Sequence, residues 1–329
     1  MSIKRCRKRG CPGPQGPLGL QGPQGNQGPQ GVTGPVAPQT APGTNVQMEG
    51  LVGFFHVGNA GSYPWSAMAL FDGDTAIQTT DRIQPNFGSF NTTLNQYGRG
   101  RTDDLIASIQ GNDFGDNLPY LVEYNRNTGV ANFVKLSGIG TNGDATVYWD
   151  SNSGSYYACT RGNNGAGNDS IYSIDHLTGI ATDITALNGG VNAGNDWTLY
   201  DMVIIGNTIF VLHSNAPGAE MYLFDRATGQ FTSDVNLEPT YTFLGSQFPW
   251  VIESTNQQKK FTMLSYDRSL NRAYIGFHPN GGAYRVLGYV EGASEAALET
   301  SLITGTFDIK ILPNIPNQVL HGLMWLPSI

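Results

Sequence analysis

Short runs in which apolar and polar residues alternate fill the chain from Leu51 onward, and clusters of Gly, Asn, Asp and Pro separate these runs. A period of two residues places successive side chains on opposite faces of a β-strand, and almost no stretch shows the apolar period of a helix. Because Gly, Asn, Asp and Pro favour turns, the breaks are predicted to be tight connections. The pattern therefore predicts an all-β head over residues 50–329.

One hairpin sequence recurs three times within this head. The copies lie at residues 124–129, 174–179 and 224–229, and their Thr-Gly pairs follow one another at intervals of 50 residues. An apolar run precedes each copy and another follows it, which predicts two strands joined by a turn. Asp or Asn begins the turn by bonding its own backbone, and Gly supplies the positive φ of a type I turn with a G1 bulge.

Two further strand candidates precede each hairpin. They are clearest at 199–205 and 208–213, which turn at Gly206-Asn207, and the preceding copy offers 145–150 and 156–160. Four antiparallel strands repeated at about 40–50 residues are typical of a β-propeller blade. The repeat therefore predicts a propeller, and a single large β-sandwich is the alternative fold.

Weaker copies of the repeat complete the predicted ring. One lies at 261–277 with 283–290, and another at 67–72 with 75–83. The C-terminal run 321–327 is expected to pair beside 51–57 and to close the ring. We expect five blades, or six, because residues 239–253 and 307–312 have no place in the repeat.

Glycine occupies every third position near the start of the chain. The nine glycines are Gly10, Gly13, Gly16, Gly19, Gly22, Gly25, Gly28, Gly31 and Gly34. Three polyproline-II chains wind together only when each places a residue without a side chain at the axis in every third position. The tract therefore predicts a short collagen-like triple-helical stalk over residues 10–35, and with it a homotrimer. A disordered Pro/Gly linker is the alternative, and the Pro/Thr-rich residues 36–49 are expected to form a neck.

Charge is distributed unevenly, with a net formal charge of −8. The predicted anchor over residues 1–9 is basic, and its charged residues are Lys4, Arg5, Arg7, Lys8 and Arg9. An acidic body argues against a nucleic acid as partner, whereas the basic tip could dock on an anionic surface or serve as a solubilising tail. Because no apolar run approaches the ~18 residues of a membrane span, we expect no membrane insertion. Because Gly-Pro repeats and not an apolar segment follow the basic start, we expect no signal sequence.

Residues that could carry chemistry are sparse. The five histidines never pair at a spacing of four residues or join Cys or Glu in a zinc-binding pattern. Cys6 and Cys11 either cross-link three chains at the base of the stalk or remain free thiols, and Cys159 stands alone. No nucleophile elbow, Walker loop or dinucleotide fingerprint occurs. We therefore expect no catalytic residues, no metal and no cofactor.

Loops rich in Asn and Gly are the candidates for binding. In propellers, the loops that join the second strand to the third, and each blade to the next, gather on one face. Asn amides can both donate to and accept from sugar hydroxyls, and aromatic rings can stack on sugars; the alternative is that these residues only form turns and pack the blades. The candidate ligand-binding residues are Tyr63, Trp65, Asn163, Asn164, Asn192, Trp197, Asn215, His278 and Asn280.

The glycine triplets rich in Gly-Pro-Gln, followed by a β head, resemble the collagen-like fibre and spike proteins of bacteriophages and other viruses. The hairpins at 125–129, 175–179 and 225–229 resemble blades of many extracellular propellers. The resemblance implies a trimeric fibre on the virion surface, outside the cell. Its N-terminus would bind a capsid or tail protein, and its head would contact a glycan or receptor on the host.

Two other classes of function remain open on the sequence. The first is a purely structural capsid decoration that binds no receptor. The second is a polysaccharide-degrading propeller enzyme or a bacterial surface adhesin, because propeller active sites collect residues from distant blades. The expectation is a protein that attaches to a surface and is not an enzyme.

Overall fold

The computed structural model describes residues 48–57, 65–80, 98–111, 119–139, 145–160, 170–184, 198–215, 218–225, 230–232, 240–244, 260–278, 286–314 and 320–328. The predicted anchor, the predicted stalk with its nine glycines, and the predicted neck up to residue 47 lie outside these ranges. The described ranges therefore cover most of the predicted head.

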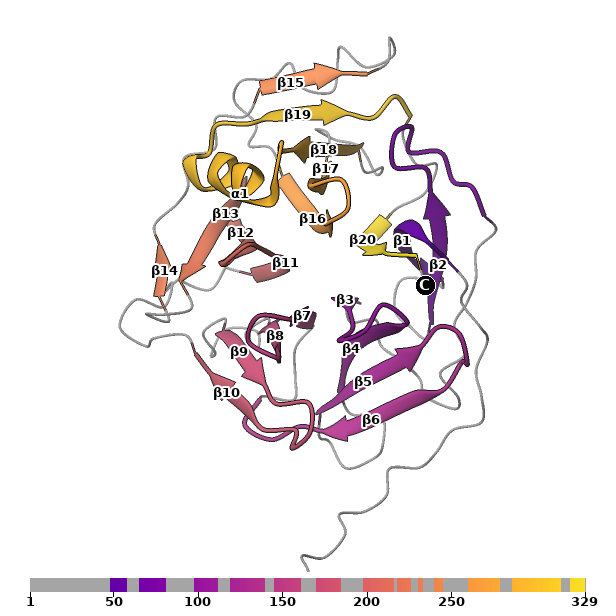
Figure 1. Cartoon of the computed structure of the whole chain (residues 1–329), viewed down its shortest axis with the longest axis vertical. Helices are drawn as coiled ribbons and strands as arrows, with labels where there is room; N and C mark the ends of the chain where they lie inside the picture. Colours follow the sequence, from indigo (N-terminus) through magenta and orange to yellow (C-terminus); the bar gives the residue numbers. More distant parts are fainter. Residues whose placement is uncertain are drawn as a thin grey trace, which may run out of the picture. The chain divides into compact units, whose positions relative to one another are not determined.

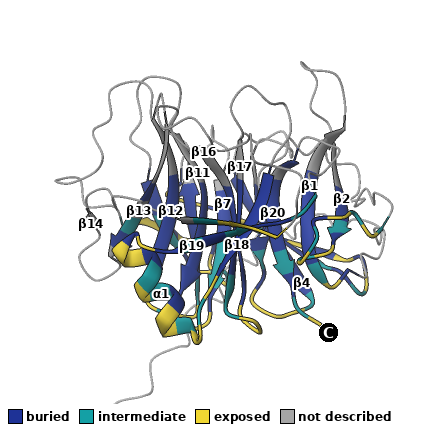
Figure 2. Ribbon diagram, turned by 90° about the horizontal axis from the view of Figure 1, so that it is seen from above, coloured by how far each residue is buried: buried dark blue, intermediate teal, exposed yellow. Residues whose placement is uncertain are grey.

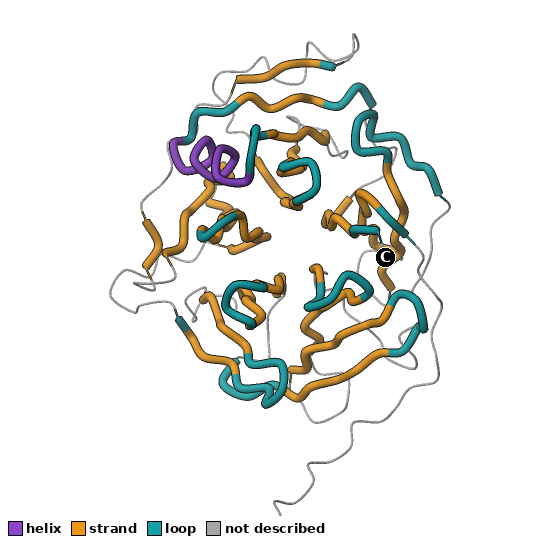
Figure 3. The backbone as a smooth tube through the Cα atoms, viewed as in Figure 1, coloured by secondary structure: helices purple, strands orange, loops and turns teal. Residues whose placement is uncertain are grey.

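The described strands form five separate sheets that are arranged as blades around a central axis (Figure 1). The all-β propeller is confirmed, with five blades in the described part of the chain. Strands and turns account for nearly all of it, with one helix at the edge (Figure 3).

Each blade begins with the strand nearest the axis and runs outward. Blade 1 contains β20 (Leu320–Leu326), β1 (Gly50–Val57) and β2 (Trp65–Phe71). Blade 2 contains β3 (Gly98–Arg99), β4 (Leu105–Gly111), β5 (Pro119–Asn125) and β6 (Ala131–Lys135). Blade 3 contains β7 (Ala145–Asp150), β8 (Ser155–Thr160), β9 (Ser170–Ile174) and β10 (Ala181–Asp183). Blade 4 contains β11 (Thr198–Ile205), β12 (Thr208–Asn215), β13 (Gly218–Asp225) and β14 (Gln230–Thr232). Blade 5 contains β16 (Lys260–Asp267), β17 (Arg272–His278), β18 (Val286–Glu291), β19 (Asp308–Ile311) and β15 (Thr240–Phe243).

The core consists of five apolar clusters, one between each pair of neighbouring blades. Successive side chains of a strand point to opposite faces of its sheet, and here each face meets another blade. Leu51 packs against blade 5 and Val52 against blade 2, for example. Figure 2 shows the result: the strands are buried on both faces, and exposure is concentrated in the turns and the helix. This explains why several strands contain consecutive apolar residues.

The turns between the third and fourth strands have the predicted chemistry in the two described copies. The side-chain oxygen of Asn125 accepts hydrogen bonds from the backbone N–H groups of Asn127 and Thr128, at 3.0 and 2.9 Å. Gly129 follows with φ 70°. The copy from Asp175 to Gly179 repeats this arrangement, with φ 71° at the glycine. In the third copy, residues 226–229 lie outside the described ranges.

The turn at Gly179 also contacts the preceding blade. A Cβ added to Gly179 would lie 2.0 Å from the carbonyl oxygen of Lys135 in blade 2. We therefore expect Gly179→Ala to destabilise the head more than Gly154→Ala. Both positions have positive φ, at 71° and 67°, and each substitution costs ~1 kcal/mol for that reason. Only Gly179→Ala must also move backbone, because a Cβ at Gly154 meets nothing within 4 Å. Urea unfolding of both variants measures the difference, and equal losses would contradict the proposed contact.

The ring closes as predicted, by pairing of the C-terminal strand with the first one. β20 lies antiparallel to β1, from the pair Gly50 and Leu326 to the pair Phe55 and Leu320. Arg126, in the turn after β5, secures this closure from blade 2. Its guanidinium donates hydrogen bonds to the carbonyl oxygens of Met48 and Pro327, which flank the paired strands.

Blade 5 contains the features that the repeat did not predict. The two segments left unplaced pair with each other, because β15 lies parallel to β19. Between β18 and β19 the chain forms α1 (Glu295–Thr304), which Ser294 caps by accepting from the N–H of Ala297. In blade 1, the strand expected at 75–83 is represented in the described residues by one bridge, between Phe71 and Gln78.

Candidate functional site

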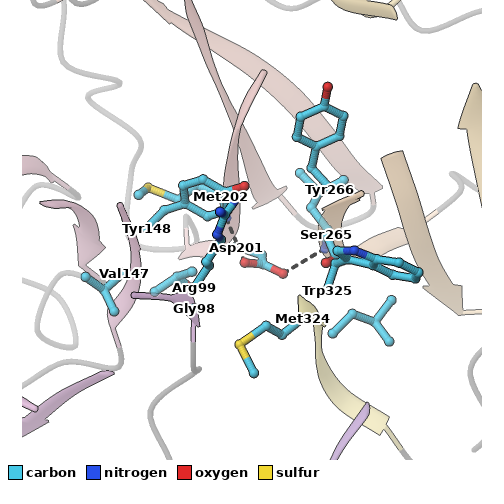
Figure 4. Close-up of a pocket in the computed structure, with 13 residues that line it drawn as sticks. Gly98, Arg99, Val147, Tyr148, Asp201, Met202, Ser265, Tyr266, Met324 and Trp325 are labelled. Atoms are coloured by element: carbon cyan, nitrogen blue, oxygen red, sulfur yellow. Dashed lines mark hydrogen bonds between the residues drawn. The ribbon is translucent and has the colours of Figure 1, made fainter. Parts of the chain in front are cut away.

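The innermost strands of all five blades line a small cavity on the axis of the propeller (Figure 4). β3, β7, β11, β16 and β20 each contribute residues to it. The cavity volume is about 20 Å³, which accommodates roughly one water molecule. This cavity can therefore hold a small ion or a water molecule, and it is too small for a sugar ring.

Glycine at the start of β3 accounts for part of this narrowness. A Cβ added to Gly98 would lie 1.7 Å from the carbonyl oxygen of Val147 in β7. The two inner strands approach each other so closely that no side chain fits between them. Blades 2 and 3 therefore meet backbone to backbone at the axis.

Asp201 is the buried carboxyl group of this cavity, with an exposed fraction of 3%. The pairing of β11 with β12 shifts by one residue between Leu199 and Asp201, next to this side chain. Its two oxygens accept hydrogen bonds from the N–H groups of Met202, at 2.8 Å, and Leu264, at 2.7 Å. The side chain of Thr146 is a third hydrogen-bond partner. Asp201 thus joins the inner strands of blades 3, 4 and 5.

The environment of Asp201 favours its neutral form. Burial raises the pKa of its carboxyl group from 3.8 to about 8, and the three hydrogen bonds oppose this shift without cancelling it. No charged neighbour is among the causes of the shift. The protonation state of the cavity therefore changes in mildly alkaline solution.

A second buried polar cluster joins blades 2 and 3 away from the axis. Glu123 is 3% exposed and accepts hydrogen bonds from the hydroxyl of Tyr156, at 2.8 Å, and the Nε of Arg101, at 2.9 Å. Burial, together with the charge of Glu123, raises the pKa of Tyr156. The phenol therefore stays protonated and donates to the carboxylate. This arrangement favours a structural role, because a tyrosine that acts as a nucleophile needs a lowered pKa.

Three of the predicted ligand-binding residues have described backbones. Trp65 begins β2 opposite Val57, Asn215 ends β12 opposite Gly218, and His278 ends β17 opposite Lys260. All three stand at the end of the strands from which the second-to-third connections leave, on three different blades. The other predicted ligand-binding residues lie outside the described residues; they are Tyr63, Asn163, Asn164, Asn192, Trp197 and Asn280.

Sequence reasoning missed the cavity residues. Thr146, Asp201 and Ser265 come from three blades, and nothing in the spacing of the chain brings them together. One signal was present: Asp201 interrupts the apolar run of its strand, and an acidic residue there is unusual.

Neither metal-ligand clusters nor membrane-spanning helices occur in the part of the chain that the structure describes. Those residues contain no group of three or more His, Cys, Asp or Glu side chains placed to hold a metal ion. Their helix is also too short to cross a membrane.

No protein-family model matches the chain, and no curated protein matches it. Among solved structures, TolB from Acinetobacter baumannii has a TM-score of 0.43 at 12% identity, over 80% of this chain and 55% of TolB. A putative TolB from Agrobacterium tumefaciens gives 0.43 at 11% identity, over 81% and 89% of the two chains. An exo-β-1,3-galactanase from Phanerochaete chrysosporium gives 0.39 at 9% identity, over 62% and 49%. This chain thus spans about half the length of the first and third of these proteins, and similarities at this level assign no function.

Proposed function

We propose that the chain is a homotrimeric attachment fibre on a virion surface. In this proposal, residues 1–9 anchor the fibre to a capsid or tail protein, residues 10–35 form the triple-helical spacer, and the propeller contacts a host-surface glycan or receptor. The observation that carries the proposal is the glycine at every third position from Gly10 to Gly34, directly ahead of a propeller. A triple helix is an extended rod, so such a tract would hold the head at a distance from the anchor.

The geometry of blade 1 supports the proposed polarity. The chain enters the head at Met48, where Arg126 binds its carbonyl oxygen, and β1 begins two residues later. Trp65, Asn215 and His278 stand at the opposite ends of their blades. The proposed ligand face therefore lies on the side of the propeller opposite to the point where the chain enters it.

Three heads on one stalk would not need tight individual sites. When one head binds, the others meet neighbouring receptors at a high effective concentration, so weak contacts add up to firm attachment. This is consistent with a ligand face built from loops, as opposed to a deep pocket on the axis.

The stalk can be tested through the mass of the protein in solution. We expect the full chain to have three times the chain mass of 35.4 kDa, measured by light scattering. Gly22→Ala should weaken the trimer because only glycine fits the axis, whereas the matched control Gln21→Ala should leave it intact. A monomeric full chain, or equal behaviour of the two variants, would rule out the triple helix.

The head can be tested separately by binding of the trimer to host glycans and cells. We expect binding that weakens greatly when residues 50–329 are presented as single heads. A trimer that binds nothing would indicate structural decoration of a capsid. Release of new reducing ends from a host polysaccharide would instead indicate an enzyme.

A further inference from the structure

Three inner strands have an irregular pairing near the proposed ligand face. In β11, β16 and β20 the pairing with the next strand shifts by one residue, and the residues within the shifts are Tyr200, Thr262 and His321. The described pairs of β3 and β7 show no such shift. Bulges of this kind are over-represented beside binding sites. Blades 4, 5 and 1 therefore differ from blades 2 and 3 at this face, and they are also the blades that contain the described ligand candidates.

Blades 5 and 1, whose inner strands are neighbours around the axis (Figure 1), bring side chains that donate hydrogen bonds to this face. Lys260 and His278 are Cα partners at the ends of β16 and β17. His56 has the same position relative to the shift in β20 as His278 has relative to the shift in β16. His321 lies within the shift of β20, and Trp65 begins β2. Three of the five histidines of the chain thus stand at one end of two neighbouring blades.

Carboxyl groups are concentrated elsewhere in the head. The described strand ends of blades 1 and 5 at this face contain neither Asp nor Glu; they are residues 55–57, 65–66, 260–261, 277–278, 286–287 and 320–321. The sequences that connect the second strand to the third in these blades, 58–64 and 279–285, also lack them, whereas those of blades 2 and 3 contain Asp113, Asp116 and Asp169. The turns at the opposite end of the head begin with Asp72, Asp150, Asp175 and Asp267. In a chain with a net charge of −8, an anionic ligand is therefore repelled least at this end of blades 5 and 1.

We propose that the ligand face of blades 5 and 1 binds an acidic glycan through Lys260, His278, His56, His321 and Trp65. The inference rests on the proposed attachment function and names the class of glycan. Ammonium and imidazole groups donate hydrogen bonds to carboxylate or sulfate oxygens, and these charge-assisted bonds are about twice as strong as the bonds that a neutral sugar forms. Trp65 supplies an aromatic ring that can stack on a sugar. Donors spread over two blades suit a polysaccharide whose anionic groups repeat.

Surface plasmon resonance of the full chain on immobilised polysaccharides tests this class of ligand. The panel contains hyaluronan, alginate and polysialic acid, which carry carboxylates, and chondroitin sulfate, which also carries sulfate. Each acidic polymer is paired with a neutral form in which the carboxyl groups are reduced to hydroxymethyl groups and sulfate is removed. We expect binding to an acidic polymer that weakens at high salt and is lost on its neutral form.

Substitutions in the full chain locate the site. Lys260→Gln and His278→Gln should each weaken binding about tenfold, as for the loss of one hydrogen bond to a charged group. The matched controls should leave it unchanged; they are Lys135→Gln in β6 of blade 2 and His176→Gln in the turn after β9. Thermal unfolding checks that all four variants fold, and if one of the two site variants does not, the other decides.

Several outcomes would overturn the proposal. Equal binding to acidic and neutral polymers would refute the acidic class and leave the attachment function standing, whereas a trimer that binds no glycan at all would refute both. Equal weakening by Lys260→Gln and Lys135→Gln would indicate general charge attraction. Because the anchor over residues 1–9 carries five cations of its own, a variant with all five replaced by Gln must keep the binding. Loss of binding in that variant would assign the acidic glycan to the anchor.

Discussion

Arg126→Met is expected to lower the free energy of unfolding by about 2–4 kcal/mol, one of the two largest effects of a single substitution that this structure predicts. The side chain of Arg126 is completely buried and donates to the carbonyl oxygens of Met48 and Pro327. Methionine fills much of the same volume but donates nothing. The buried carbonyl of Met48 and the partly buried carbonyl of Pro327 would then lose their partner, and an unsatisfied buried group costs ~1–3 kcal/mol. Both acceptors flank the β1–β20 pair, so the loss falls on the closure of the ring.

Urea unfolding measures this loss, and hydrogen exchange of β20 locates it. Arg126→Lys should destabilise the head less than Arg126→Met. A single ammonium group replaces the two guanidinium nitrogens that donate to the two carbonyls, so it is expected to keep only part of this bonding. Arg268→Met is the matched control: its guanidinium is 53% exposed and lies 3.6 Å from Glu295, so the expected cost is below ~1 kcal/mol. Equal losses for Arg126→Met and Arg268→Met would show that Arg126 does not hold the ring closed.

The parts of the fold that were predictable are those determined by neighbours in sequence. The turn at Asn125 forms from hydrogen bonds within four residues and a glycine that accepts positive φ. Such a turn leaves the same signature wherever it occurs. The 50-residue interval between copies then predicts the blades, because each copy must bury both faces against another.

The fourth copy of the turn departs from the repeat at its glycine position. Asp72 accepts from the N–H groups of Asp74 and Thr75, at 2.8 and 2.9 Å, just as Asn125 does in its own turn. Ala76 occupies the glycine position with φ 62°. Without Thr-Gly this copy, predicted at 67–72 with 75–83, leaves a weaker signal in the sequence than the other three. Tertiary contacts hold the alanine in this conformation, since it is buried between blades 1 and 5.

Contacts between distant segments explain the other omissions. The pairing of β15 with β19 joins residues far apart in sequence, and neither segment carries the repeat. α1 was detectable in principle, because Ser294 and Gly305 are ordinary helix caps. The helix also depends on blade 4, where Glu299 accepts hydrogen bonds from Asn207 and Thr208. The ligand residues proposed from loop composition remain a prediction.

Asp201→Asn is expected to change how the stability of the head depends on pH. The folded-state pKa of Asp201 is about 8, above its ordinary value of 3.8, so the folded protein keeps a proton that the unfolded chain releases. Stability from this group is therefore complete in acid and is lost as the pH rises toward 8. The slope inside that window is about 1.4 kcal/mol per pH unit, or roughly 2 kcal/mol between about pH 6 and pH 8. Asparagine does not titrate and lacks this slope.

Asp201→Asn should therefore be the less stable protein in acid, and the difference should shrink and then change sign as the pH rises toward 8. In acid, Asp201→Asn is less stable by about 1–3 kcal/mol, because the amide NH₂ meets the N–H of Met202 or Leu264 where a carboxyl oxygen accepted from it. Urea unfolding in choline buffer, without metal cations, measures both curves, and effects of all other titrating groups cancel in their difference. A difference that stays constant across this pH range would show that Asp201 is ionised throughout. Its three hydrogen bonds would then outweigh its burial, and the protonation state of the cavity would not change with pH.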